Sequence, residues 1–428
     1  MELYSSNQTY KLFHWNMLDM SEVIESWTID SIVTDPPYEL NFMGKGWDNS
    51  WIAFQPDTWK KCLDVLKPWG YLLAFWWSRT YHRIACAIED AGFEIRDCIM
   101  WLYGSWFPKS MALDKSIEWK LTTWSANKTE FKNLDWTKEE SWNWGISKMS
   151  KEQWFRNTDY TEDNHLRTVE VKHTTELAKQ YKGWWTCLKP SYEPIIVARK
   201  PLEWSCTDNV IKYGVGGINI DECRVETDEN LNWWAYSKWE YDTSDNVYKL
   251  WLKRIEWQYE QPQGRFPANT ILTYDESDFE EVCGGFHNNE QRYYYTAKAS
   301  KRDRDEWLDE FEEKKWIRSN APRNNEEVKT KPRKNVHPTV KPTDLMQYLV
   351  RLVTPNGWTV LDPFNWSGST GKAVMYENKD RNKNYKYIWI ELTEEYLPIA
   401  KARIEYVINQ EKEKSEQPKE QHLFSNYS

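Results

Sequence analysis

The sequence has 428 residues, 40% of them hydrophobic and 29% charged, which is enough for one large domain or several smaller ones. With 56 Lys and Arg against 66 Asp and Glu, the net charge of −10 excludes a generally basic nucleic-acid coat protein, although not a local basic face. There is no long apolar run and no signal-peptide pattern, so we expect no membrane partner. The 7 Cys are scattered and never spaced C-x-x-C, which argues against a disulfide framework or a metal site and favours the cytoplasm.

Strands and helices are expected to alternate along the first hundred residues. Strands are predicted at 31–34, 71–75 and 93–100, and helices at 59–66 and 81–91. Two polar stretches follow, at 119–180 and 226–261, with a buried strand between them at 193–198. The alternation resumes with a helix at 343–353, a strand at 359–361, a second helix and a strand at 387–390. This pattern predicts an α/β protein with a parallel sheet, interrupted by a long middle region.

The motif Asp35-Pro36-Pro37-Tyr38 directly follows the first predicted strand. The prolines fix the backbone and keep a carbonyl out of the hydrogen-bond ladder. The motif therefore presents a carboxylate, a carbonyl and an aromatic face at the edge of the sheet where α/β proteins bind ligands. A planar heterocycle with an exocyclic amine would fit these groups, although Asp-Pro and Pro-Pro also occur in ordinary turns.

A second candidate site is the segment 359–371, in which a strand leads through a loop of small residues into a helix. Such a loop lets a cofactor approach the backbone closely. Glu391 ends the next predicted strand, about 20 residues after Gly368, where nucleotide-binding folds place an acidic partner for a ribose. A plain strand–helix–strand connection with a Ser/Gly turn is the alternative interpretation.

The third segment, His337-Pro-Thr-Val-Lys341-Pro342, precedes the helix at 343–353. On its own it is more typical of a Pro-rich connector with a solvated lysine than of a loop that adds polar contacts to the same pocket.

In combination, the three segments resemble the amino-methylating DNA methyltransferases, which transfer a methyl group from S-adenosylmethionine to an exocyclic base nitrogen. The catalytic tetrapeptide of that family matches 35–38, its H-P-T-x-K-P segment matches 337–342 and its cofactor loop matches 362–371. The order, with the catalytic motif first and the cofactor loop last, is that of the family's β arrangement. The resemblance implies an α/β, Rossmann-like methyltransferase fold with a mostly parallel twisted sheet and an inserted target-recognition region.

The resemblance also implies roles for single residues. Tyr38 would stack on a flipped-out base, while Asp35 and the carbonyl of Pro36, in a turn fixed by Pro37, would accept hydrogen bonds from its amino group. Glu391 would bind the ribose of S-adenosylmethionine. Further cofactor contacts would come from Asp362, Phe364, Ser367, Gly368, Ser369 and Thr370, and at the methionyl end from Thr339 and Lys341. No nucleophilic Cys and no metal are expected.

The same resemblance divides the chain into a catalytic half at 1–110, a target-recognition region at 111–334, a cofactor-binding half at 335–410 and a flexible tail at 411–428. The strand near 193–198 is expected to return to the sheet. Double-stranded DNA is the expected partner in a bacterial or phage-encoded cytoplasmic protein, and a restriction endonuclease companion and a homodimer stay open. Candidates for phosphate contacts, or for a merely solvated surface, are Lys298, Lys301, Arg302, Arg304, Arg323, Lys331, Arg333 and Lys334.

The chemistry leaves alternatives open. Within the family, the form beginning with Asp35 leans towards N6 of adenine, and N4 of cytosine is the nearest rival. A DNA-binding homologue with impaired catalysis is the second alternative, because bulky residues stand in the cofactor loop. RNA or protein methylation is less expected, because related tetrapeptides usually carry Asn in place of Asp35 and place the cofactor loop first.

Tryptophan and glycine occur in unusual numbers, 29 and 16, although ordinary usage predicts about 30 glycines. Tryptophan often stands where the resemblance expects glycine, as at Trp69, Trp76, Trp77, Trp106, Trp185, Trp358, Trp366 and Trp389. An indole conflicts with positive φ and with close backbone approach, most severely at Trp366 in the cofactor loop. UGA codons that the source reads as Gly, but that were translated as Trp, would explain both numbers. The rival is a natural Trp-rich and catalytically dead protein.

Overall fold

The computed structural model describes residues 2–39, 50–103, 110–123, 174–188, 190–227, 263–274, 293–297, 299–308, 310–313, 334–337 and 339–416. The chain forms two compact units. The larger unit comprises Met1–Leu102, Tyr192–Asp275 and Glu281–Ser428, and the second comprises Tyr103–Ser191 with Glu276–Glu280.

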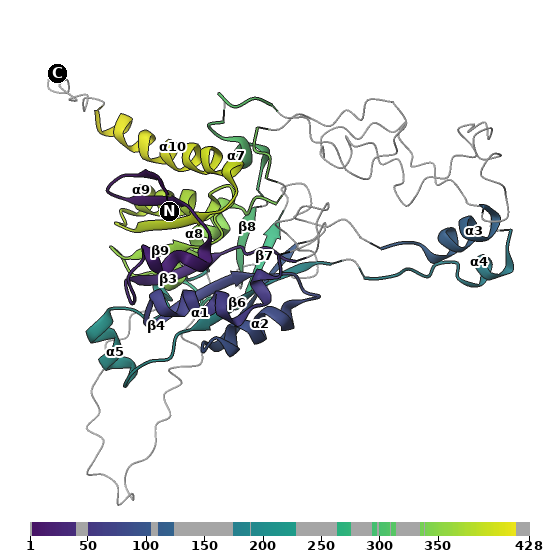
Figure 1. Cartoon of the computed structure of the whole chain (residues 1–428), viewed down its shortest axis with the longest axis horizontal. Coiled ribbons are helices and arrows are strands. Elements are labelled where there is room, and N and C mark those ends of the chain that lie inside the picture. Colours follow the sequence, from purple (N-terminus) through teal and green to yellow (C-terminus); the bar gives the residue numbers. More distant parts are fainter. Residues whose placement is uncertain are drawn as a thin grey trace, which may run out of the picture. The chain divides into compact units, whose positions relative to one another are not determined.

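A ten-stranded mixed sheet in the order β1-β2-β10-β9-β3-β4-β6-β5-β7-β8 runs through the larger unit (Figure 1). Its strands are β1 (Glu2–Ser6), β2 (Tyr10–His14), β3 (Ile29–Thr34), β4 (Leu66–Phe75), β5 (Glu94–Tyr103), β6 (Tyr192–Arg199), β7 (Thr270–Tyr274), β8 (Tyr294–Ala297), β9 (Thr359–Asp362) and β10 (Lys386–Glu391). The five neighbours β2, β10, β9, β3 and β4 are parallel to one another. β1 runs antiparallel to β2, and β6 runs antiparallel to β4 and β5.

The apolar runs of the sequence correspond to this sheet. All six expected strands are confirmed within β3, β4, β5, β6, β9 and β10. The strand expected near 193–198 does return to the sheet, where β6 lies between β4 and β5. Its antiparallel direction was not expected, because a run of apolar side chains carries no information about direction.

Helices cover both faces of the sheet. On β3, Ile32 belongs to one apolar core with Trp59 of α1 (Pro56–Val65) and Ile84 of α2 (Tyr81–Asp90). The adjacent Ser31 instead shares a 2.7 Å hydrogen bond with Thr354, directly after α8 (Thr343–Val353). Successive side chains of a strand point to opposite faces, so α1 and α2 cover one face and α8 lies on the other.

Two more helices, α9 (Ser369–Arg381) and α10 (Leu397–Glu416), follow the cofactor-loop and Glu391 segments, and α9 packs against both α8 and α10. Shorter helical segments of the larger unit are η1 (Met17–Glu22), η4 (Ile52–Phe54), α5 (Cys206–Tyr213), η6 (Asp221–Cys223), α7 (Lys301–Asp305) and η10 (Glu394–Tyr396). The flexible tail was expected from residue 411, but α10 continues through that point to Glu416. The remainder of the expected tail, 417–428, lies outside the described residues.

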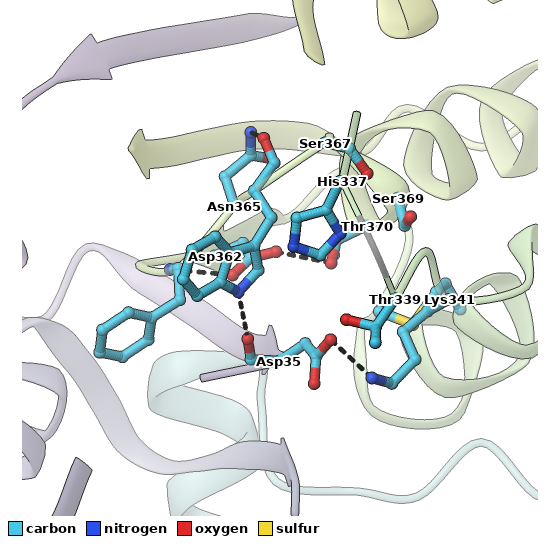
Figure 2. A pocket seen from close by; sticks show the side chains of 12 residues that line it. Asp35, His337, Thr339, Lys341, Asp362, Asn365, Ser367, Ser369 and Thr370 are labelled. Carbon is cyan, nitrogen blue, oxygen red and sulfur yellow. Dashed lines mark hydrogen bonds and ion pairs between the residues drawn. The ribbon is translucent and has the colours of Figure 1, made fainter. Parts of the chain in front are cut away.

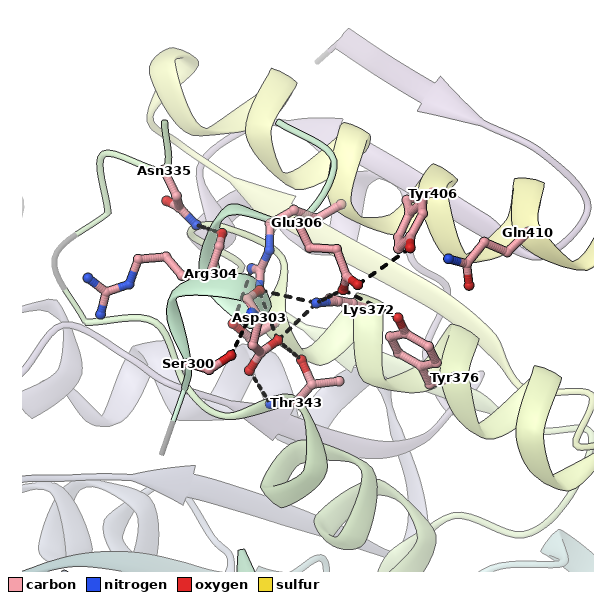
Figure 3. A network of polar contacts seen from close by, with 12 residues as sticks. Ser300, Asp303, Arg304, Glu306, Asn335, Thr343, Lys372, Tyr376, Tyr406 and Gln410 are labelled. Atoms are coloured by element: carbon pink, nitrogen blue, oxygen red, sulfur yellow. Dashed lines mark hydrogen bonds and ion pairs between the residues drawn. The ribbon is translucent and has the colours of Figure 1, made fainter. Parts of the chain in front are cut away.

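Side chains of the segment around α7 form hydrogen bonds and ion pairs with the helices α8 and α9 (Figure 3). The Asp303 carboxylate accepts hydrogen bonds from Thr343 at the start of α8 and from Lys372 of α9. Lys372 also lies 2.9 Å from a Glu306 oxygen. The expected target-recognition region 111–334 therefore includes a part that packs on the helices of the larger unit.

The second compact unit contains α3 (Leu113–Thr123) and α4 (Glu176–Gln180). Glu118 of α3 is buried, and its carboxylate accepts hydrogen bonds from the backbone N–H groups of Thr174 and Thr175. This ties the start of α4 to α3. Over the described ranges of both units, we find no helix that is long and apolar enough to cross a membrane.

Candidate active site

The site lies at β3, where the chain stops adding strands on one side of the sheet and later adds strands on the other side. β3 is followed in sequence by β4 on one side, whereas β9 and then β10 lie on its other side. In open α/β sheets, ligands bind outside the carboxyl ends of the strands at such a switch point. The turn that begins with Asp35 leaves β3 there, and the loop that begins after Asp362 leaves the adjacent β9.

Asp35 is held in the turn after β3 by an ion pair with a distant lysine. Its Oδ2 lies 2.6 Å from Nζ of Lys341, and its second oxygen, Oδ1, is buried and accepts no hydrogen bond from any described residue. Pro36 and Pro37 are buried, so the turn is firmly packed at its prolines. The structure thus presents one spare carboxylate acceptor at the wall of the site.

Lys341 joins Asp35 to a residue that the sequence did not single out. Its Nζ lies 3.7 Å from Oε2 of Glu193, the second residue of β6. The side chains of Lys341 and Glu193 are buried, and that of Asp35 is 14% exposed. Burial lowers the pKa of Lys341, but the two carboxylates outweigh this effect and raise the pKa overall. Burial raises the pKa of Glu193, and the Lys341 ammonium opposes that rise.

Tyr38 contacts the same group of charges. Its hydroxyl donates to Oε2 of Glu193 at 3.2 Å, and its ring centroid lies 5.3 Å from that of Trp76. Burial, followed by the nearby charges of Asp35 and Glu193, raises the pKa of Tyr38 well above its ordinary value. The side chain is therefore a neutral phenol at physiological pH.

Asp362 anchors the loop after β9. Its carboxylate accepts hydrogen bonds from the hydroxyls of Thr34 and Thr370, both at 2.6 Å, and from the backbone N–H of Phe364 at 3.1 Å. Burial raises the pKa of Asp362 to about 6, although these hydrogen bonds oppose the rise. Asp362 thus links the ends of β3 and β9 to the first turn of α9.

The loop enters α9 through Gly368, whose φ of 77° is in the left-handed region. A Cβ on Gly368 would also lie 3.1 Å from Ala400 of α10, so the backbone approaches that helix closely. The neighbouring Ser367 carbonyl accepts a 2.6 Å hydrogen bond from the fully buried Arg403. Close approach and a glycine turn at a helix N-terminus are features of loops that bind nucleotides.

Glu391 ends β10, as the sequence predicted, and its carboxylate is buried beside the same loop. It accepts hydrogen bonds from the backbone N–H of Trp366 at 2.6 Å and from that of Thr393 at 2.7 Å. Burial raises the pKa of Glu391 to about 8, against the effect of both bonds. A ribose contact from Glu391 stays a prediction, because in this conformation the carboxylate supports the loop.

A pocket with an empty volume of about 260 Å³ lies between the two loops (Figure 2). Most of the predicted cofactor-binding residues line it, together with Asp35 and four further residues. The predicted residues are Asp35, Thr339, Lys341, Asp362, Phe364, Ser367, Ser369 and Thr370, and the further ones are His337, Met346, Asn365 and Trp366. Hydroxyls, carboxylates, an aromatic ring and an apolar thioether suit a nucleoside that carries an amino-acid tail.

Trp366 forms part of the wall of this pocket. Its ring stacks on that of His337 with centroids 5.3 Å apart, and its Nε1 donates to the Asp35 carbonyl at 2.6 Å. Both partners line the pocket, so the indole bridges its walls. The competition between Trp366 and a cofactor stays a prediction.

The sequence singled out most residues of this pocket. It did not predict the pairing of Lys341 with Asp35, and it missed Glu193. Lys341, expected at the methionyl end of a cofactor, is paired with Asp35 here. Glu193 was missed, although a lone acidic residue at the start of the apolar run Pro194-Ile-Ile-Val-Ala198 signals a buried charge that needs a partner. Of the candidate phosphate contacts, Lys298, Arg323, Lys331 and Arg333 lie outside the described residues.

A switch-point pocket between a glycine-containing loop and a strand-ending carboxylate defines an α/β protein of the Rossmann-like, nucleotide-binding type. The family model for DNA methylase, of the N6/N4 methyltransferase class, matches residues 29–402. The chain belongs to this DNA methylase family, and it has the family's Rossmann-like fold.

Individual relatives match over short stretches. The type II methyltransferase M.Cfr9I of Citrobacter freundii is 31% identical over 115 residues, which are 27% of this chain and 33% of that protein. M2.DpnII of Streptococcus pneumoniae is 36% identical over 69 residues, 16% of this chain and 24% of the relative. The matches thus span about a third or less of these curated relatives.

Solved structures similar to this chain include the crystal structure of M1.HpyAVI, with 14% identity, a TM-score of 0.37 and coverage of 92% of this chain and 98% of that one. The cytosine-N4-specific PvuII DNA methyltransferase has 12% identity and a TM-score of 0.41, and the match covers 95% of this chain and 93% of that one.

Proposed function

We propose that the protein is a site-specific DNA methyltransferase that transfers a methyl group from S-adenosylmethionine to the N6 amino group of adenine in a flipped-out base. The observation that carries the proposal is the Asp35 carboxylate, which keeps one buried acceptor without a partner among the described residues, at a pocket shared with the loop after β9. Family membership supports the reaction class. The Asp-Pro-Pro-Tyr form of the tetrapeptide favours adenine.

S-adenosylmethionine supplies an activated methyl group on a sulfonium centre. Oδ1 of Asp35 would accept a hydrogen bond from the base amino group and so draw the nitrogen lone pair out of conjugation with the ring. The nitrogen then forms the new bond to the methyl carbon, the carbon–sulfur bond breaks with its electrons left on sulfur, and the amine loses a proton to solvent. The Tyr38 ring would support the flipped base, so this chain acts by positioning and electrostatics.

The cofactor would occupy the pocket lined by Phe364, Ser367, Ser369, Thr370 and Asp362, with Gly368 permitting close approach. Thr339, which is exposed and lines the pocket, would meet its polar tail. Glu391 would meet the ribose after releasing a backbone N–H of the loop.

The reaction is tested by incubating the purified protein with duplex DNA and S-adenosylmethionine and identifying the nucleosides by mass spectrometry. N6-methyladenine is the expected product. N4-methylcytosine would keep the reaction class and overturn the base assignment, and methylated RNA or protein without methylated DNA would overturn the proposal. The Trp366→Gly variant is assayed in parallel, so that an obstructed pocket is not mistaken for a wrong reaction.

Double-stranded DNA as the partner is tested separately by salt dependence. Binding must neutralise phosphates despite the net charge of −10, so log affinity should fall linearly with log salt concentration. An affinity that does not change with salt would contradict a duplex substrate.

A further inference from the structure

Five tryptophans have a backbone conformation that L-residues rarely adopt. Their φ angles are 62° at Trp27, 59° at Trp51, 69° at Trp69, 60° at Trp307 and 49° at Trp366. Over the described residues, Glu39 and Asn382 are the other non-glycine residues with positive φ. Among the described non-glycine residues, most of those with positive φ are therefore tryptophan.

This enrichment does not follow from the abundance of tryptophan, which makes up 29 of the 428 residues. Non-glycine residues with positive φ are uncommon, and Asn, Asp and His are the types enriched among them. A bulky aromatic residue there is an outlier, whereas glycine adopts this conformation without steric conflict. The backbone thus identifies glycine positions by a criterion independent of any family resemblance.

Side-chain packing gives a second, separate indication. The Trp69 ring lies directly against Gly216, where a Cβ would lie only 2.0 Å from it, so the indole is accommodated there only because position 216 is glycine. The indole nitrogens of Trp69 and Trp389 are buried and have no acceptor among the described residues. Buried indole N–H groups usually have a partner, so among the five positions Trp69 buries a donor that glycine would not bring.

We infer that Trp27, Trp51, Trp69, Trp307 and Trp366 stand at glycine positions, and that the active protein carries glycine there through UGA codons read as Gly. The backbone adds Trp27, Trp51 and Trp307 to the set expected from sequence. Trp69 and Trp366 belong to both sets.

The remaining tryptophans of the sequence-based set do not gain this support from the backbone. Trp106 lies outside the described residues. Trp76 lies in the apolar core without positive φ, and its Nε1 donates to the Thr80 hydroxyl at 2.8 Å. Positive φ therefore supports glycine at Trp27, Trp51, Trp69, Trp307 and Trp366 and not at the other tryptophans of that set.

At Trp366 the inference bears on the cofactor site, and in this respect it rests on the proposed function. The indole bridges His337 and the Asp35 carbonyl across the pocket. Glycine would remove the ring from the pocket wall and relax the backbone that Glu391 holds.

The gene sequence tests the inference without any assay of activity. We expect UGA at the five codons and UGG at Trp59, the control, which lies in α1 and donates from Nε1 to the Ala53 carbonyl at 2.9 Å. Peptide mass spectrometry of the protein from its source should show Gly at the five positions. UGG at the five codons, or Trp in the native peptides, would overturn the inference.

The consequence for the pocket is tested by calorimetric titration of S-adenosylmethionine into Trp366→Gly and Trp307→Gly. Both changes replace a tryptophan that has positive φ by glycine and so remove backbone strain, but Trp307 does not line the pocket. We expect affinity to rise at least about tenfold in Trp366→Gly, the effect of removing a severe steric conflict, and not in Trp307→Gly. Equal affinities in a folded Trp366→Gly and the parent would overturn the obstruction.

A different observation, the shared lysine, carries a second inference. The Lys341 ammonium lies between two carboxylates, 2.6 Å from Asp35 and 3.7 Å from Glu193. It also lies 5.2 Å from the Tyr38 ring centroid and 5.0 Å from that of Phe75. An ammonium against aromatic faces can move between neighbouring acceptors without losing all stabilisation.

We propose that Glu193 is a positioning residue that draws Lys341 away from Asp35 when the target amine binds. While Lys341 is paired with Asp35, that carboxylate is a weaker acceptor for the base, because the ammonium already holds one oxygen. Glu193 provides the alternative counter-charge and also holds the Tyr38 hydroxyl. This inference rests on the proposed function.

Glu193→Gln tests the role, because the amide keeps the shape and can still accept from Tyr38 but loses the charge. We expect methyl transfer, as kcat/KM for DNA, to fall about ten- to hundredfold, in line with the strength of hydrogen bonds to charged groups, with unchanged S-adenosylmethionine affinity. The matched control is Glu94→Gln on β5, whose carboxylate pairs with Arg199 instead.

A double variant separates positioning from a merely structural effect. If Glu193 acts through Lys341, Glu193→Gln combined with Lys341→Met should lose no more activity than the worse single change. Multiplying losses would overturn the proposal, as would full activity of Glu193→Gln. Absence of methyl transfer in the parent and in Trp366→Gly would instead count against the proposed function.

Discussion

The turn after β3 and the loop after β9 leave neighbouring parallel strands, yet they differ in what fills them. The β3 turn is fixed by prolines and holds a largely buried group of charges in which one lysine serves two carboxylates. The β9 loop ends in the small residues Ser367 and Gly368, and Trp366 stands directly before them with a left-handed backbone. The β3 turn thus presents a buried carboxylate acceptor, whereas an indole lies in the pocket wall beside the β9 loop.

The largest expected effect comes from removing the acceptor of the β3 turn. Asp35→Ala should lower the rate of methyl transfer about 10²–10³-fold, as loss of a preorganised catalytic hydrogen bond does, while S-adenosylmethionine affinity stays unchanged. Single-turnover kinetics and calorimetry measure the two quantities. Asp35→Asn is the control of similar size, and full activity in either variant would remove Asp35 from the mechanism.

The corresponding change beside the β9 loop should affect binding instead. Glu391→Ala should weaken S-adenosylmethionine binding about ten- to hundredfold, because an acceptor for the ribose and for the loop backbone is lost. Titration at saturating DNA measures this effect. An unchanged dissociation constant would refute the ribose assignment of Glu391.

The buried acid of the β9 loop should also give stability a pH dependence. Because burial raises the pKa of Glu391 to about 8, the folded protein holds a proton that the unfolded chain releases above its ordinary pKa of about 4.3. The unfolded state then binds fewer protons, so stability falls as pH rises from about 5 to 8.

Glu391→Gln should remove this contribution. Between about pH 5 and 8, the free energy of unfolding of the parent should therefore fall by about 3–4 kcal/mol more than that of the variant. Urea unfolding at several pH values measures the difference. Glu394→Gln, at an exposed position in the same segment, should run parallel to the parent. Parallel curves for Glu391→Gln as well would contradict the account.

The smallest effect on activity is expected from removing the Tyr38 hydroxyl. Tyr38→Phe keeps the ring and removes the hydroxyl that donates to Glu193, so activity should fall about two- to tenfold. Tyr38→Ala also removes the stacking surface and should cost about ten- to hundredfold. Equal losses in the two variants would show that the hydroxyl, and not the ring, supports the base.

The sequence predicts the parts of this molecule that depend on local pattern. Apolar runs predict β3, β4 and β9, and the motifs at Asp35 and Gly368 predict which strand ends carry the site. The direction of β6 and the strands β1, β2, β7 and β8 were not predicted, because pairing direction and short edge strands depend on contacts that local pattern does not encode.

The same limit applies to the charges. The pairing of Lys341 with Asp35 joins residues 306 positions apart, and Glu193 reaches them only because β6 lies beside β4. The excess of tryptophan was visible in the composition, but the left-handed backbone at Trp27, Trp51 and Trp307 required coordinates. Local pattern thus locates the site, and the fold assigns its partners.

The most direct test of the account compares methylated nucleosides produced by Trp366→Gly and by Trp366→Gly combined with Asp35→Ala, on the same duplex DNA with S-adenosylmethionine. We expect N6-methyladenine from Trp366→Gly and almost none from the double variant, at equal affinity for S-adenosylmethionine. Equal methylation by both variants would contradict it, because the carboxylate after β3 would then have no part in the reaction.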